Sequence, residues 1–247
     1  MNRYGAVAMR RLLGLDSRAR AEFKPEARPW RHVAWFGVGA AIAFAVPYVF
    51  TSVLDLDHDL YYLIFFSVTL AFLSAYVVAT RIDLGDLFRR NWRWSLALGI
   101  LAAVFVSANV LSRDSTPGPS GAYAVFEVFW RGGTYGVVDA LLLTAFPGVV
   151  ALGLLRNNLE GLWRKIVYVL AALPLVLIIT GMYHLGYKQF REDGIGPPEF
   201  GNTVISVPMF ATASPIGSIF AHASMHITAD IHSYETDIFL PPQTEAP

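Results

Sequence analysis

The chain contains no cysteine, and only 15% of its 247 residues are charged. Without cysteine, disulfides, thiolate metal ligands and a cysteine nucleophile are excluded. Soluble domains carry roughly 25% charged residues. The shortage of charge, together with a mean hydropathy of +0.46, therefore predicts an integral membrane protein. No internal repeat is evident in the sequence, which argues against a transporter built from inverted repeats.

Long apolar segments make up most of the chain. A bilayer core of ~30 Å needs about 20 apolar residues in a helix, and six segments approach or exceed this length. They lie at Val33–Leu54, Leu60–Thr80, Trp94–Ser112, Gly121–Leu155, Lys165–Tyr187 and Glu199–His232. The expected fold is an all-α, polytopic transmembrane bundle with six to seven membrane-embedded helices.

The fourth and the last apolar segments are too long for one straight span. We expect Gly132–Gly133 and Pro147 to bend or break the fourth segment. In the last, Pro208 and residues 212–215 predict a division into two helices. The first would be a short or re-entrant helix at Asn202–Ala211, and the second a full helix from about Ser214.

Loop charges predict the orientation of the bundle. Eight Lys or Arg and three Asp or Glu precede His32, and four Arg lie between Arg81 and Arg93. Residues 156–165 are also basic, whereas residues 55–59 hold three Asp and no Lys or Arg. Positive charge marks cytoplasmic loops, so the N-terminus is expected in the cytoplasm. The organisation is a basic tail (1–31), a bundle (32–232) with a motif-bearing core (121–232), and an acidic tail (233–247).

Ionisable residues inside the apolar segments are the candidates for function, because a charge at membrane depth costs at least ~2.5–3.5 kcal/mol. Glu127 and Arg131 are four residues apart, which places them on one helix face where they can form an ion pair. This pair either orients the helix or holds Glu127 as a general base. His184 lies at the end of the fifth segment. Asp139, twelve residues beyond Glu127, is expected to be structural, paired with Arg131 or with a polar group on another helix.

The last segment carries His222, His226 and Asp230 at four-residue intervals, which stacks them along one helix side. Two imidazoles at this spacing can chelate a metal ion such as zinc. No Glu stands between them as it does in the helical signature of zinc proteases. A polar stripe facing a water-filled cavity is the alternative. His184, His222 and His226 are the predicted ligands of a divalent metal.

The order of these clusters resembles the CPBP (Abi) intramembrane proteases, the group that includes the CAAX prenyl endopeptidases. The family motifs are Glu-Glu-x-x-x-Arg, Phe-x-x-x-His and His-x-x-x-Asn or Asp. Similar positions in this chain are Phe126-Glu127-x-x-x-Arg131, Thr180-x-x-x-His184 and His222-x-x-x-His226. The likeness covers roughly residues 122–232. Phe126 replaces the first Glu, Thr180 replaces Phe, and His226 replaces Asn or Asp.

The resemblance implies an intramembrane peptidase that cleaves a hydrophobic or lipidated peptide delivered from the bilayer. Glu127 would take a proton from a water molecule between itself and His184, while Arg131 holds Glu127 in position. His222 and His226 would stabilise the oxyanion, directly or through a divalent metal. The resemblance and the short loops favour a prokaryotic plasma membrane.

Two alternatives remain open at this point. Phe126 favours a non-catalytic scaffold or subunit that keeps the bundle and lacks the base. The histidines also suit a membrane protein that binds a metal or haem, or that relays protons or transports ions. No nucleic-acid partner is expected, because a basic tail next to the membrane usually sets topology rather than binding nucleic acid.

Overall fold

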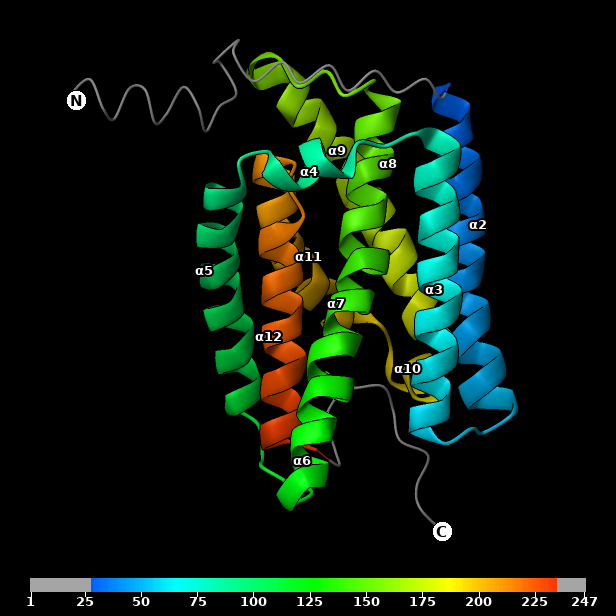
Figure 1. Cartoon of the computed structure of the whole chain (residues 1–247), viewed down its shortest axis with the longest axis vertical. Coiled ribbons are helices and arrows are strands. Elements are labelled where there is room, and N and C mark those ends of the chain that lie inside the picture. Colours follow the sequence, from blue (N-terminus) through cyan, green and yellow to red (C-terminus); the bar gives the residue numbers. More distant parts are fainter. Residues whose placement is uncertain (1–27, 235–247) are drawn as a thin grey trace, which may run out of the picture.

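The computed structural model describes residues 28–234, and all of the named secondary-structure elements in this part are helices. The all-α bundle predicted from the sequence is therefore confirmed. The long helices lie side by side with their axes roughly along one direction (Figure 1). The tails predicted at 1–31 and 233–247 lie largely outside the described residues.

Five helical segments in the described part are long and apolar enough to cross a membrane. They are Pro29–Val53 (α2, Pro29–Pro47, continued by the π-helical η1, Tyr48–Val53), His58–Thr80 (α3), Trp92–Leu111 (α5), Gly121–Leu154 and Gly161–Leu185 (α9). The short helices α4 (Leu84–Arg89) and α10 (Lys188–Asp193) lie in connections. Two further helices, α11 (Gly196–Thr212) and α12 (Ile216–His232), have 17 residues each, or about 25 Å.

The segment Gly121–Leu154 is one continuous helical path that crosses the bundle (Figure 1). It comprises α6 (Gly121–Glu127), η2 (Val128–Thr134), α7 (Tyr135–Ala140), η3 (Leu141–Ala145) and α8 (Phe146–Leu154). The expected bend or break takes the form of the two π-helical turns η2 and η3, a form of helix distortion that is frequent at functional sites.

Each π-helical turn contains, or is closely followed by, residues that weaken α-helical hydrogen bonding. Gly132 and Gly133 lie inside η2, and Pro147 follows η3 by two residues. Proline has no amide hydrogen for the carbonyl four residues earlier, which here belongs to Leu143. That carbonyl accepts a hydrogen bond from the side-chain amide of Asn202 on α11. The irregular backbone thereby joins the segment to a neighbouring helix.

The division of the last apolar segment into two helices is confirmed. Helix α11 ends at Thr212, Ala213 adopts a left-handed conformation (φ 56°), and α12 begins at Ile216. The chain reverses there, so α11 and α12 form a hairpin (Figure 1). Helix α11 is longer than expected, because it begins at Gly196 rather than near Asn202.

Helices α5 and α12 run parallel and pack closely through small residues. A Cβ atom at Gly99 would lie 2.4 Å from the carbonyl oxygen of Gly217, so the two backbones touch at this point. Nearby, the Ser95 hydroxyl donates to the Ser214 carbonyl at 2.9 Å. On the other side of the segment Gly121–Leu154, aromatic side chains of α2, α3 and α8 form the main core.

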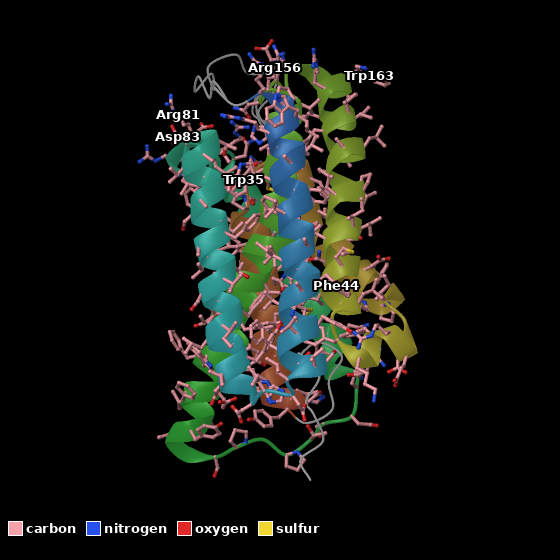
Figure 2. The ribbon with its side chains drawn as sticks, turned by 90° about the vertical axis from the view of Figure 1, so that its right-hand side faces the viewer. Trp35, Phe44, Arg81, Asp83, Arg156 and Trp163 are labelled. Atoms are coloured by element: carbon pink, nitrogen blue, oxygen red, sulfur yellow. The ribbon has the colours of Figure 1, made fainter. Side chains whose placement is uncertain are left out.

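The two ends of the bundle differ in composition. We call them the α4 end, which holds the chain reversal before α12, and the α6 end, where α6 begins and α12 finishes (Figure 1). Arg81, Asp83, Arg156 and Trp163 all lie towards the α4 end (Figure 2). The two basic loops therefore lie at the same end of the molecule.

Candidate functional site

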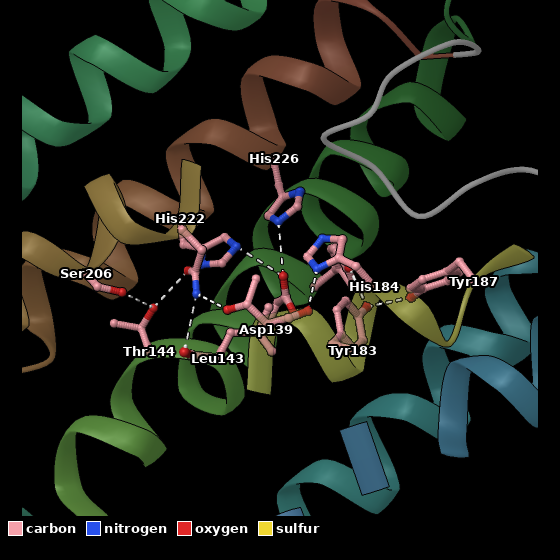
Figure 3. A network of polar contacts seen from close by, with 12 residues as sticks. Asp139, Leu143, Thr144, Tyr183, His184, Tyr187, Ser206, His222 and His226 are labelled. Carbon is pink, nitrogen blue, oxygen red and sulfur yellow. Dashed lines mark hydrogen bonds and ion pairs between the residues drawn. The ribbon is translucent and has the colours of Figure 1, made fainter. Parts of the chain in front are cut away.

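A carboxylate and two imidazoles meet where α7 crosses α12. Asp139 is on α7, and His222 and His226 are one turn apart on α12. One carboxylate oxygen, Oδ2 of Asp139, lies 3.0 Å from Nε2 of His222 and 3.5 Å from Nε2 of His226 (Figure 3). The two imidazole rings stack with their centroids 4.9 Å apart. All three side chains are buried.

Two glycines bring these helices close enough for the contact. A Cβ atom at Gly132 would lie 2.9 Å from the Cα of Ile227, and one at Gly136 would lie 2.7 Å from the Cα of Ala223. Gly132 and Gly136 are four residues apart, as in the small-residue motifs that let membrane helices approach. Asp139 follows Gly136 by three residues, so its short side chain reaches the histidines of α12.

His184 on α9 belongs to the same site. Its Nδ1 lies 2.8 Å from the carbonyl oxygen of Thr180, which accepts and so requires Nδ1 to carry the hydrogen. In the neutral ring, Nε2 then has a free lone pair. One cavity is lined by all four residues, Asp139, His184, His222 and His226.

Polar side chains of α11 and α9 hold His184 and its helix in place. The side-chain amide of Asn202 donates to the Thr180 hydroxyl at 2.6 Å, and its oxygen accepts from the Thr144 hydroxyl at 3.0 Å. Thr144 also contacts the Ser206 hydroxyl at 3.1 Å (Figure 3). This network links three helices beside the site, as outer-shell contacts do in sites that must hold a fixed geometry.

A wall of tyrosines closes the site on the α3 side. The ring of Tyr135 stands edge-on to the His226 ring, with 4.8 Å between centroids. The Tyr135 hydroxyl lies 2.6 Å from that of Tyr183, which also contacts the Tyr187 hydroxyl at 2.6 Å. Tyr61 completes this buried group of hydroxyls. The wall fixes the ring plane of His226 and supplies phenolic donors at the edge of the cavity.

The cavity has a volume of about 170 Å³ and joins the buried site to the side of the bundle. Its walls come from α5, α7, η3, α9, α10, α11 and α12. The lining residues used below are Phe105, Asn109, Arg113, Asn202, Phe200 and Ile205. Several water molecules fit this volume, since one occupies ≈ 30 Å³ in the liquid.

The donor set fits a divalent cation. Ligand atoms of Asp139, His222 and His226 all lie within 4.8 Å of one another. Two imidazoles and a carboxylate are ligands that zinc takes in catalytic sites, with a fourth position left for water. Within the described residues the Nδ1 atom of His222 has no hydrogen-bond partner. A buried carboxylate shared by two imidazoles needs a compensating positive charge, from a bound cation or from a proton on one ring.

The structure places Glu127 and Arg131 in a second cluster, away from this cavity. Glu127 accepts a hydrogen bond from the Tyr234 hydroxyl at 3.2 Å. Arg131 donates to the Tyr234 carbonyl at 2.9 Å, lies over the Tyr234 ring, and approaches Asp230 at 3.8 Å. Burial, aided by the charge of Glu127, raises the pKa of Tyr234, so the phenol stays protonated as a donor.

Glu127 lies outside the cavity that contains His184, although a water molecule between the two side chains was expected. Glu127 is twelve residues from Asp139, or roughly 18 Å along a helix, and it does not line the cavity that contains His184. The π-helical turn η2 begins directly after Glu127. It alters the four-residue register on which the expected pairing of Glu127 with Arg131 rested. Arg131 contacts Asp230 and Tyr234 instead.

Sequence reasoning placed Asp139 outside the candidate site, and the structure places it at the centre. It does pair with polar groups on another helix, which was one of the two expectations, but these are the histidines of α12. One signal in the sequence could have identified it. Asp139 stands alone in a strongly apolar run from Val137 to Ala151, the position where an unpaired charge costs most.

No family model, no curated protein and no solved structure matches the chain. The chain forms a helical bundle with five membrane-length apolar helices, and it buries an Asp-His-His cluster beside a fourth polar residue, His184.

Proposed function

We propose that this protein is a membrane-embedded hydrolase whose reaction takes place in the cavity around Asp139, His184, His222 and His226. The observation that carries the proposal is the convergence of these side chains, from three helices, on one small cavity. A hydrophobic or lipidated peptide is the proposed substrate, on the basis of the resemblance to the CPBP intramembrane proteases.

In this proposal Asp139, His222 and His226 hold a divalent metal ion, with zinc as the first candidate. A metal ion in such a site polarises a carbonyl group and lowers the pKa of bound water. The three donors come from two helices that are locked together by the close approach at Gly132 and Gly136. The ligand geometry is thus set by the helix packing rather than by flexible loops.

His184 acts as the general base in place of Glu127. Its Nε2 has a lone pair, because Nδ1 donates to the Thr180 carbonyl, and it faces the site without belonging to the three-donor group. The imidazole takes the proton of the attacking water and returns it to the leaving group. Asn202 positions His184 through Thr180, while the phenols of Tyr135 and Tyr183 are at hand to donate to a developing oxyanion.

Glu127 and Arg131 keep a structural role in this proposal. Both bind Tyr234, two residues beyond the end of α12, to the segment Gly121–Leu154, and Arg131 also approaches Asp230 on α12. Their cluster sits at the α6 end of the bundle. The proposed location is a prokaryotic plasma membrane with the α4 end in the cytoplasm, supported by the gathering of both basic loops at that end.

The test compares two acidic residues of the same helical path. Purified protein in nanodiscs is assayed with a library of quenched fluorogenic membrane peptides and analysed for bound metal. We expect Asp139→Asn to lose bound metal and hydrolysis, and His184→Gln to keep metal while losing at least about 100-fold in rate. Glu127→Gln, the matched control, keeps both. Loss of hydrolysis in Glu127→Gln with activity retained in Asp139→Asn would refute the proposal.

A metal-binding or ion-transport protein is the second candidate, favoured by the same Asp-His-His cluster. It predicts bound metal without hydrolysis, and uptake of the metal ion into proteoliposomes that is lost in Asp139→Asn. Haem is a poorer fit than a single ion, because a cavity of about 170 Å³ is small beside the ≈ 300–1,000 Å³ of typical cofactor pockets. An absorption spectrum of the purified protein without a Soret band would remove that option.

A non-catalytic scaffold remains the third candidate. Phe126 favours it, because the resemblance places a catalytic Glu there. Phe126 is exposed and stacks on the Trp130 ring, so it faces away from the cavity. The scaffold reading predicts neither bound metal nor hydrolysis in the experiment above.

A further inference from the structure

The cavity opens to the side of the bundle between α5 and α11. Phe105 on α5 and Phe200 on α11 both line it and are 50% and 64% exposed. Ile205 and Val106 continue the apolar lining inwards. A molecule that reaches the buried histidines by this route therefore passes between apolar side chains on the lateral, apolar surface of the bundle.

The same wall carries one cation towards the α6 end. Arg113 is the only Lys or Arg among the described residues that line the cavity. It is exposed, and within the described part its guanidinium makes no hydrogen bond or ion pair. Asn109, one turn earlier on α5, also lines the cavity. The lateral opening is thus apolar at Phe105 and Phe200, and it is polar and cationic towards the α6 end, at Asn109 and Arg113.

The register between α5 and α12 gives the distance between these two parts. Ser107 contacts Thr228, and the Arg113 carbonyl contacts His232. Arg113 therefore lies level with His232, six residues beyond His226, or about 9 Å along the helix axis. A bound molecule can reach both Arg113 and the candidate site if it carries a charge about 9 Å from the group that enters the site.

We propose that the lateral opening binds a membrane amphiphile with an acidic group, held by Arg113, and an apolar chain lying against Phe105 and Phe200. This inference rests on the proposed function, because the lipidated peptide proposed as substrate is itself such an amphiphile when it carries a carboxylate. The shared chemistry is a single acidic group at the membrane interface, which a lipid phosphate or a carboxylate supplies equally well. A guanidinium binds both through paired, charge-assisted hydrogen bonds.

Because the chain contains no cysteine, a single introduced cysteine can be labelled specifically, and the test relies on this. A single fluorophore is attached at Leu101→Cys, an exposed position one turn from Phe105 on α5 that does not itself line the cavity. The control position is Leu170→Cys on α9, which is also exposed and does not line the cavity. Quenching is then measured with three nitroxide-labelled probes in detergent micelles. They are stearate (a carboxylate), phosphatidic acid (a phosphate) and phosphatidylcholine as the zwitterionic reference. The measured quantity is the apparent Kd at position 101, corrected by the quenching at position 170.

We expect one or both acidic probes to bind more tightly than phosphatidylcholine, as reported by the fluorophore at position 101. Arg113→Gln weakens that binding roughly tenfold, as expected for the loss of a charge-assisted hydrogen bond, and Arg113→Lys restores part of it. Arg93→Gln, at the other end of α5, is the matched control and leaves it unchanged. The probe that shows the preference identifies the source of the acidic group.

Equal binding of all three probes, or an unchanged preference in Arg113→Gln, would overturn the inference. The same measurement in Asp139→Asn separates it from the proposed hydrolysis. If the acidic probes bind to both wild type and Asp139→Asn while no substrate is cleaved, the hydrolase proposal fails and the amphiphile site stands. If cleavage depends on Asp139 and the probes show no preference, the hydrolase proposal stands and the amphiphile site fails.

Discussion

Asp139 shares one carboxylate oxygen between two imidazoles, and this sharing makes it the most informative single residue to change. Asp139→Asn keeps the volume of the side chain and removes the negative charge that attracts a cation. We expect the wild type to gain stability with zinc, by about 2.7 kcal/mol at a concentration of 100 times its Kd. Asp139→Asn should gain almost nothing. Thermal unfolding with and without zinc measures both values, and calcium serves as the control ion, because it prefers oxygen ligands.

The stabilisation by zinc should also depend on pH with a defined sign. Imidazole and carboxylate ligands bind a metal only when they are deprotonated, so binding releases protons. Acidification therefore competes with the metal, and the zinc-dependent part of the stability is present at neutral pH and lost on the acidic side. An equal zinc effect at pH 5 and pH 8 would contradict ligation by His222 and His226.

Arg131 is the residue whose loss should harm the fold rather than the candidate reaction. Among the described residues it is the cation that approaches Asp230, and the side chains of Glu127, Arg131 and Asp230 are all buried. Arg131→Met leaves two carboxylates without it, which should cost about 3–5 kcal/mol. Arg131→Lys should recover part of this loss. Denaturant unfolding in mixed micelles measures the change, and the triple variant Glu127→Gln, Arg131→Met, Asp230→Asn should approach the wild-type stability.

At the scale of the helical elements, the close approach of the segment Gly121–Leu154 to α12 decides whether the site exists. A Cβ at Gly136 would lie 2.7 Å from the Cα of Ala223, a backbone atom that cannot turn aside, whereas a Cβ at Gly133 would meet only the Val128 carbonyl at 3.6 Å. We expect Gly136→Ala to destabilise the protein by about 1–3 kcal/mol and to weaken metal binding. Gly133→Ala should leave metal binding unchanged, as measured by isothermal titration with zinc.

The close approach of Gly136 to Ala223 also explains which structural features can be predicted from the sequence and which cannot. Helix positions follow from apolar length, and the division at Ala213–Pro215 follows from local turn residues, so these features are predictable. The rotation of a long helix about its axis is set by non-local contacts such as Gly136 against Ala223, and by the π-helical turn η2. For this reason the sequence favoured Glu127 as the partner of the histidines, while the structure brings Asp139 to them.

At the scale of the whole molecule, the two ends of the bundle predict its orientation. Both basic loops lie towards the α4 end (Figure 2), and positive charge favours the cytoplasmic side. Two single-cysteine variants test this in a chain that has no other cysteine. One is Ser115→Cys, because Ser115 lies in the exposed loop at the α6 end. The other is Glu160→Cys, because Glu160 is exposed in the connection at the α4 end. In intact bacterial cells expressing the protein, a membrane-impermeant maleimide should label position 115 and spare position 160 until the membrane is permeabilised. The reverse pattern would place the α4 end outside, and with it the Arg113 opening in the cytoplasmic half of the bilayer.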